Sequence, residues 1–280
     1  MLKRILIVVD ESDASYAAKL YAIKLAKQKK CKLTGIGIID IPWITAAQPE
    51  PLGGGAYKIY RDQEVISKTH HKVKELLKDF EEMSNKEKVD CLIFEREGWP
   101  ASEIENLSEE HDIIVIGKAT DFHFELEEDS NLTVRHLARD NPRPIIVVPS
   151  KENDISEDHN ILIAYDGSLQ AARSLHMFLL LGLARDKKLH LTSVAKTKAE
   201  ANRIVGPAQR MCEQHGYKAS SEGIESSESI ELILKEKIKT MKPSLLVMGA
   251  YSRNGLKELI FGSTTEHMIK DPSVPVFIHH

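Results

Sequence analysis

The sequence is poor in cysteine and has no excess of positive charge. Its three cysteines, Cys31, Cys91 and Cys212, show no CxxC spacing, so we expect free thiols in a reducing compartment. Lys and Arg number 38 against 42 Asp and Glu, a net charge of -4. This balance disfavours nucleic acid as a partner, because binding to it is driven by a basic surface.

Long hydrophobic runs are also missing, and none of the apolar stretches is long enough to span a membrane. The N-terminal segment MLKRILIVVDES has two basic residues before a short apolar run that ends at Asp10. That run is too short for the apolar region of a signal peptide. We therefore expect a cytoplasmic protein with no membrane partner.

Several signatures of ATP-using enzymes are absent. The lack of GxxxxGK[ST] excludes a Walker-type NTPase, and neither HxGH nor SGGxDS, typical of nucleotidyl-transferring and ATP-pyrophosphatase proteins, is found. We see no general base or metal constellation that catalysis would need. His70 and His71 lie in a polar helical stretch, where we expect them to be solvated rather than to bind a metal.

What the sequence does contain is an internal repeat. Ile5 to Val9 is an apolar run closed by Asp10, and Ile161 to Tyr165, closed by Asp166, repeats it as ILIAYDGS beside ILIVVDES. Runs without polar alternation are typical of parallel strands buried on both faces. Both halves follow the order β-α-β-α-β-α-β-α-β, which predicts two copies of one α/β domain.

The repeat gives the domain boundaries. We predict an N-terminal domain over residues 1–150, a polar linker over 151–158 and a C-terminal domain over 159–280. Each domain ends in an apolar strand preceded by proline, Ile145 to Val148 and Val274 to Ile278. Because a last strand leaves an exposed edge, these two strands are candidates to pair with each other within the chain.

The first half contains a stretch without counterpart in the second. Residues 41–58 are rich in Pro and Gly and are interpreted as a loop. This loop is either a plain surface loop or, through Trp43 and Tyr57, a cover over a ligand or partner surface. A long amphipathic helix is expected from Tyr60 to Met83, and the terminal residues 279–280 are interpreted as a disordered tail or tag remnant.

The best candidate site lies between Leu245 and Glu266, LLVMGAYSRNGLKELIFGSTTE. This stretch predicts a buried strand, a glycine-marked loop and a helix that begins at Gly-Ser-Thr-Thr. Unpaired backbone N–H groups and the positive end of a helix converge at such a junction. The pattern therefore indicates an anion site, and a phosphate group in particular.

The repeat and this junction resemble the universal stress protein (UspA-like) family in its tandem form. Nucleotide-binding members carry a glycine, a second glycine three residues on, and, after nine residues, a glycine followed by Ser or Thr. The second half has Gly249, then Ser252 in place of the second glycine, then Gly262 and Ser263. The resemblance covers nearly the whole chain and implies α/β architecture. It implies two tandem doubly wound, Rossmann-like (HUP-type) domains, each a five-stranded parallel open sheet with helices on both faces.

The resemblance also implies a ligand, ATP or a related adenine nucleotide in the C-terminal domain, with Mg²⁺ as a companion. It assigns Asp166 to the ribose and adenosine side, Ala164 to the space beneath the base and Val194 to the adenine edge. The remaining nucleotide-binding positions that it implies, at the sugar and phosphates, are Met248, Gly249, Ser252, Arg253, Gly262, Ser263 and Thr264.

The first half departs further from the family pattern. It keeps Gly117, but Thr120 and Ser130 stand where the later glycines would be. The loop between them holds four carboxylates, which would repel a triphosphate. We therefore predict that the N-terminal domain, including Asp10, does not bind ATP in the family manner.

Three functions remain open from the sequence. The leading one is a regulatory stress-response protein that binds an adenine nucleotide without dedicated catalysis. The alternatives are an interaction or scaffold protein, or a binder of another small ligand, with the same fold, and a slow ATPase or autophosphorylating protein. Homodimerisation of the tandem chain is left undecided.

Overall fold

A computed structural model describes residues 1–46, 55–120, 122, 132–150, 160–184, 186–250 and 263–280, and the structural statements below concern these residues. The first half contributes the strands β1 (Arg4–Val8), β2 (Lys32–Ile39), β3 (Cys91–Glu97), β4 (Ile113–Gly117) and β5 (Ile145–Val148). The second half contributes β6 (Asn160–Ala164), β7 (Lys188–Ala195), β8 (Lys218–Glu225), β9 (Leu245–Gly249) and β10 (Val276–His279). The expected order of strands is confirmed.

Helices alternate with these strands. In the first half they are α1 (Asp13–Lys29), α2 (Ile41–Ile44), α3 (Gly55–Lys86), α4 (Pro100–Ser108) and α5 (Leu132–Asp140). In the second half they are α6 (Leu169–Leu181), α7 (Lys198–Gln214), α8 (Ile230–Met241) and α9 (Ser263–Lys270). Among the described residues no helix is long and apolar enough to cross a bilayer.

The two halves share one ten-stranded sheet in the order β3-β2-β1-β4-β5-β10-β9-β6-β7-β8. Each half is a five-stranded parallel unit, and the halves meet where β5 pairs with β10. That junction is the one antiparallel pair between the described strands, with Val147 opposite Val276 and Ile145 opposite Ile278. The predicted pairing of the two last strands within one chain is therefore confirmed.

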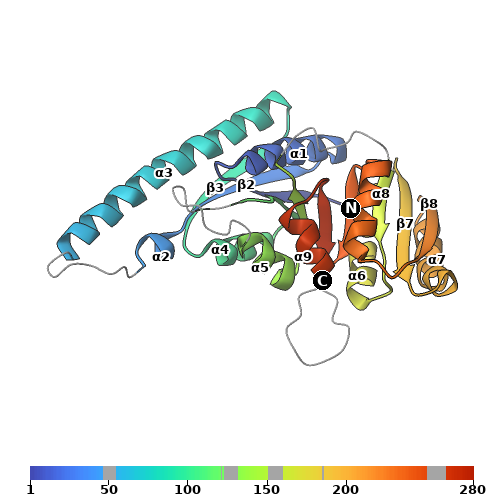
Figure 1. Ribbon diagram of the computed structural model, residues 1–280. Coiled ribbons are helices and arrows are strands. Elements are labelled where there is room, and N and C mark those ends of the chain that lie inside the picture. The colour runs from blue at the N-terminus through green and yellow to red at the C-terminus, as the bar shows by residue number, and fades with distance from the viewer. Residues whose placement is uncertain (47–54, 121, 123–131, 151–159, 185, 251–262) are drawn as a thin grey trace.

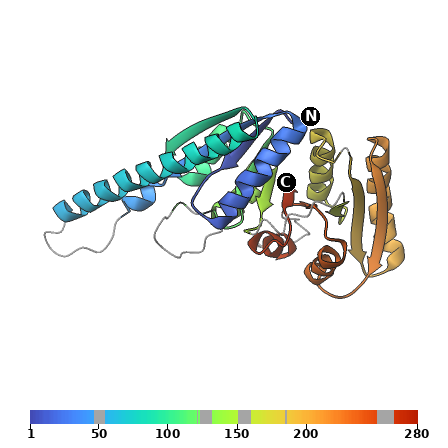
Figure 2. The ribbon, with the colours of Figure 1, turned by 90° about the horizontal axis from the view of Figure 1, so that it is seen from above.

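Helices cover both faces of the sheet (Figures 1 and 2). One core cluster joins one face of the sheet to α1, α3, α6 and α7, and the other joins the opposite face to α4, α5, α8 and α9. Ile5 to Val8 are all fully buried, as expected for a strand with helices on both sides. The predicted doubly wound α/β fold is confirmed, and the antiparallel junction makes the whole sheet mixed.

The prediction of one continuous loop over residues 41–58 is wrong at both of its ends. Asp40 caps the short helix α2 by accepting a hydrogen bond from the Trp43 backbone N–H at 2.9 Å. Trp43 is half-buried and packs against the core, whereas Tyr57 is 73% exposed. The helix α3 begins at Gly55 and projects past the end of the sheet (Figure 1). Residues 47–54 lie outside the described part of the chain.

His70 is not solvated as predicted. Its Nδ1 lies 2.7 Å from a carboxylate oxygen of Glu95, and its Nε2 lies 3.3 Å from one of Glu97, so the ring connects α3 to β3. His71 is mostly exposed and lies 3.2 Å from Glu75 on its own helix. Each nitrogen of His70 thus faces the carboxylate of a different glutamate of β3.

Candidate functional site

Asp166 lies just beyond the carboxyl end of β6, in the middle of the second half's sheet. Its Oδ1 accepts a hydrogen bond from the Ser168 backbone N–H at 2.9 Å, and Ser168 in turn caps α6. The residue is exposed, and among the described residues no partner is recorded for its Oδ2. One carboxylate oxygen thus remains available to a ligand at this edge of the sheet.

Asp10 occupies the equivalent position in the first half but has a different environment. It is only 1% exposed, and its Oδ1 accepts hydrogen bonds from both the backbone N–H and the hydroxyl of Ser12. Its own N–H donates to the Ser15 hydroxyl, and the adjacent Glu11 pairs with Lys72 of α3. The polar groups of Asp10 therefore serve the fold of the first half.

The turns after the two aspartates also differ at the residue that follows each of them. Gly167 follows Asp166 with φ +77, a left-handed conformation that glycine adopts readily and other residues rarely do. The first half has Glu11 at this point of the repeat, and Glu11 is not among the described residues with positive φ. The turns that follow β1 and β6 therefore differ in backbone conformation as well as in side chains.

Val194, near the end of β7, offers backbone groups at the same edge. Within a parallel ladder the peptide groups of alternate residues point to opposite neighbours. Thr192 bonds toward β6 by accepting the Tyr165 N–H at 2.9 Å, so Val194 points the same way, past the end of β6 at Ala164. The peptide of Val194 therefore faces space that no described strand fills.

Gly249 ends β9, and close packing accounts for its lack of a side chain. A Cβ at this position would lie 2.6 Å from the backbone nitrogen of Ala171 in α6. The same is true of Gly117 in the first half, whose Cβ would lie 2.6 Å from the carbonyl carbon of Ala14 in α1. This glycine is thus required by helix–strand packing in both halves.

Side chains from α6 and α9 fix the backbone around the end of β9. The Ser174 hydroxyl donates to the Met248 carbonyl at 2.8 Å, and the Thr265 hydroxyl donates to the Gly249 carbonyl at 3.2 Å. The Met248 side chain is buried in the core, and Ala164 beneath the edge is half-buried. Ser174 and Thr265 were not predicted as site residues, because a serine or threonine on a helix carries no sequence signal of a distant partner.

The phosphate end of the predicted site is described in part. Ser263 begins α9, and Thr264 is half-buried in its first turn. Ser252, Arg253 and Gly262 lie outside the described residues. The structure thus brings Ala164, Asp166, Val194, Met248, Gly249 and Thr264 to the carboxyl edge of the second half's sheet.

α9 also contacts the first half. Glu266 pairs with Arg135 of α5 at 3.0 Å, and Asp271, just after α9, pairs with Lys118 at the end of β4 at 2.9 Å. Hydrogen bonding to Lys118 holds the pKa of Asp271 below its ordinary value. The helix that begins at the predicted phosphate site is therefore tied to both halves of the chain.

His279 lies beside Gly249 in the β9–β10 ladder, at the position that Val148 holds in the first half. Its Nδ1 is buried and finds no hydrogen-bond partner among the described residues. Burial lowers the pKa of His279 to about 4, and the positive charges of His280, Arg173 and Arg143 act in the same direction. His279 belongs to β10, so its interpretation as part of a disordered tail is wrong.

This histidine predicts a pH dependence of stability. In the unfolded chain His279 has the ordinary pKa of 6.5, whereas in the folded chain it is protonated only near pH 4. Between these two values the unfolded state binds one more proton, so stability falls as the pH drops. We expect His279→Val, which copies Val148, to reduce the loss of urea stability between pH 7 and pH 5. Equal losses in the variant and the wild type would contradict this expectation.

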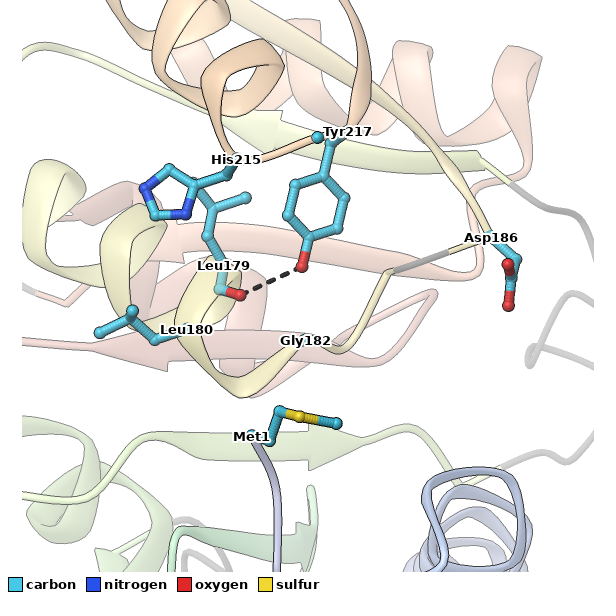
Figure 3. Close-up of a pocket in the computed structure, with 8 residues that line it drawn as sticks. Met1, Leu179, Leu180, Gly182, Asp186, His215 and Tyr217 are labelled. Carbon is cyan, nitrogen blue, oxygen red and sulfur yellow. Dashed lines mark hydrogen bonds between the residues drawn. The ribbon is translucent and has the colours of Figure 1, made fainter.

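A cavity of about 610 Å³ lies elsewhere, between the N-terminus of the chain and the second half (Figure 3). Its lining includes Met1, Leu179 and Tyr217, and the Tyr217 hydroxyl donates to the Leu179 carbonyl at 3.1 Å. It also contains Gly182, which caps the C-terminus of α6, whereas Asp166 precedes the N-terminus of that helix. The cavity is therefore at the opposite end of the second half's strands from the candidate site.

The described part of the chain contains no group of three or more His, Cys, Asp or Glu side chains that could hold a metal ion. The cysteines also lack the environment of reactive thiols, because burial raises the pKa of Cys212 to about 12 and those of Cys31 and Cys91 to about 11. The described polar groups at the candidate edge are the Asp166 carboxylate, the Val194 peptide and the backbone near the start of α9.

This fold defines a tandem, doubly wound α/β protein with a polar edge at the carboxyl ends of the second half's strands. The chain belongs to the universal stress protein family, whose model matches residues 1–121 and 159–280. It is similar to the universal stress protein Slr1230 of Synechocystis, with 23% identity over 98% of this chain and 99% of that protein.

A solved structure of a family member shows the same fold. A universal stress protein from Archaeoglobus fulgidus matches with a TM-score of 0.68 at 18% identity, and the match covers 99% of this chain and 97% of that chain. A family protein from Arabidopsis thaliana, solved with AMP bound, matches with a TM-score of 0.38 at 10% identity. That match covers 56% of this chain and 97% of the Arabidopsis chain.

Proposed function

We propose that this protein is a stress-response regulator that binds ATP or a related adenine nucleotide in its second half, without dedicated catalysis. The nucleotide would lie at the carboxyl edge of the sheet, with the adenosine near Asp166, Ala164 and Val194. Its phosphates would lie at the start of α9, near Ser263 and Thr264, with Ser252, Arg253 and Gly262 of the preceding loop. Mg²⁺ would accompany the phosphates.

The observation that carries this proposal is the contrast between Asp166 and Asp10. Both carboxylates follow the first strand of their half, but Asp10 is buried and bonded to Ser12, while Asp166 is exposed with one oxygen available. Such a carboxylate oxygen can accept a hydrogen bond from a ribose hydroxyl. The contrast supports one nucleotide site per chain, in the second half.

The backbone geometry supports the same orientation of the ligand. Val194 directs a peptide N–H and C=O beyond the end of β6, and an adenine edge carries a matching acceptor and donor. The first turn of a helix leaves backbone N–H groups without intrahelical partners, and at the start of α9 such groups would suit phosphate oxygens. Together these groups support a nucleotide that would lie along one edge of the sheet.

Asp166→Ala tests the adenosine end of the site. We expect ATP affinity to fall about tenfold, as for loss of one charge-assisted hydrogen bond of roughly 1.5 kcal/mol. Thermal stability should change little, because the side chain is exposed. Calorimetric titration of the full chain with ATP measures the affinity, and Asp186→Ala, another exposed aspartate of the second half, is the control.

The outcomes separate the proposal from its alternatives. Unchanged ATP affinity in Asp166→Ala would place the site elsewhere. No ATP binding by the wild-type chain would favour the interaction or scaffold protein of the same fold. ATP turnover that Asp166→Ala abolishes would favour the slow ATPase.

A further inference from the structure

The two outer strands of the sheet, β3 and β8, each have one side without a neighbour among the described strands. In β3 the Asp90 carbonyl accepts the Leu33 N–H of β2 at 2.9 Å, so even-numbered residues bond toward β2. The peptide groups of Cys91, Ile93 and Glu95 therefore point outward from the edge. Such a row of unpaired groups is a template for another strand.

The side chains of β3 divide between the two faces of the sheet. Ile93 lies on the face of the sheet that α3 covers. A Cβ added to Gly35 of β2 would contact both the Phe80 ring of α3 and the Cγ2 of Ile93, so these side chains share one face. By alternation, Leu92, Phe94 and Arg96 lie on the opposite face. Leu92 is 51% exposed, Phe94 is half-buried, and the Arg96 guanidinium lies 5.2 Å from the centre of the Phe94 ring.

The internal repeat shows that this apolar face is particular to β3. Cys91 pairs with Leu33 as Ala219 pairs with Leu189, so Leu92 corresponds to Ser220 and Phe94 to Glu222. Glu222 is exposed and pairs with Lys237 at 2.6 Å. The edge strand of the second half is thus polar where β3 is apolar, although both have the same place in the fold.

We infer that β3 is a dimerisation edge, on which the β3 of a second copy of this chain pairs antiparallel about a two-fold axis at Ile93. In this register the outward peptide groups of Ile93 face those of Ile93 in the partner subunit, and Cys91 faces Glu95. Leu92 of each chain lies opposite Phe94 of the other, which covers the exposed apolar side chains.

Charge complementarity between Asp90 and Arg96 indicates that the strand on this edge comes from a second copy of the chain. The same register places Asp90 opposite Arg96, and two-fold symmetry forms this pair twice. Both side chains are exposed, and the Asp90 side chain is 82% exposed and makes a long contact, at 4.0 Å, with the Lys32 Nζ of its own chain. Within one chain the two residues are six positions apart on an extended strand, roughly 20 Å, too far to pair with each other. Their charges can meet only between two copies.

Phe94→Glu tests the apolar part of this interface. It gives β3 the residue that β8 carries at the same position. Sedimentation equilibrium of the full chain should show a dimer for the wild type and a dissociation constant at least about tenfold higher for the variant. Leu92→Ser, which copies Ser220 of β8, should also raise the dissociation constant. Leu232→Glu, at a 58% exposed leucine of α8, is the control and should leave the dimer unchanged.

A charge exchange tests the register. Asp90→Arg alone and Arg96→Asp alone each place like charges opposite one another twice, and each should raise the dissociation constant about tenfold. The double variant restores opposite charges and should return the constant to near the wild-type value. A monomeric wild type, or a dimer that survives Phe94→Glu, would overturn the proposal. Failure of the double variant to recover would overturn the register.

Discussion

The full chain carrying Gly262→Asp is expected to bind ATP about 100-fold more weakly than the wild type, a loss of about 2.7 kcal/mol. Gly262 lies outside the described residues and immediately precedes α9, which begins at Ser263. An aspartate there places a carboxylate at the helix start that the phosphates would occupy, so like charges repel and the backbone N–H groups gain a competing acceptor.

The internal repeat supplies a matched control for this variant. Ser130 has the equivalent place in the first half, and Ser130→Asp adds the same charge to a loop that we propose binds no nucleotide. Calorimetric titration should give wild-type ATP affinity for Ser130→Asp. Equal losses in the two variants would indicate a nonspecific effect of charge, and unaltered binding by Gly262→Asp would place the phosphates elsewhere.

Gly249→Ala is expected to destabilise the fold by about 2–3 kcal/mol, in the range that overpacking costs. The new Cβ would meet the Ala171 nitrogen at 2.6 Å, a backbone atom that cannot rotate away. Gly117→Ala should cost a similar amount, because its Cβ would meet the backbone of α1 at 2.6 Å. Gly55→Ala, with no atom within 4 Å of its Cβ, is the control and should be neutral or slightly stabilising.

Urea denaturation of the full chain measures these differences as shifts of the transition midpoint. The expected result is two large shifts and one small shift. A Gly249→Ala variant that keeps wild-type stability but loses ATP binding would show that the glycine serves the ligand rather than the packing. A stable Gly117→Ala variant would contradict the packing account in the first half.

Much of the fold could be predicted because the repeat is visible in the sequence. The runs at 5–9 and 161–165 lack polar alternation, and the structure buries all of the first run and Ile161 to Ile163 of the second. The Pro-preceded runs that end the halves became β5 and β10, which pair as predicted. Uninterrupted apolar runs and their repeated order predict such strands. The short helix α2, by contrast, depends on the one side-chain hydrogen bond that caps it.

The differences between the halves were harder to predict. Asp10 and Asp166 look alike in the sequence, but the structure distinguishes them by the left-handed turn at Gly167 and by the hydrogen bonds of the Ser12 and Ser15 hydroxyls with Asp10. The half-buried position of His279 depends on strand pairing across the sheet, which a terminal His-His sequence does not reveal.

The stoichiometry of ATP binding to the wild-type chain tests the central claim most directly. Calorimetric titration of the full chain should give one ATP per chain. Asp166 of the second half is exposed to solvent, whereas Asp10, at the equivalent position of the first half, is buried. Two ATP per chain would mean that the first half binds despite its acidic loop, and no binding would mean that neither half is a nucleotide site.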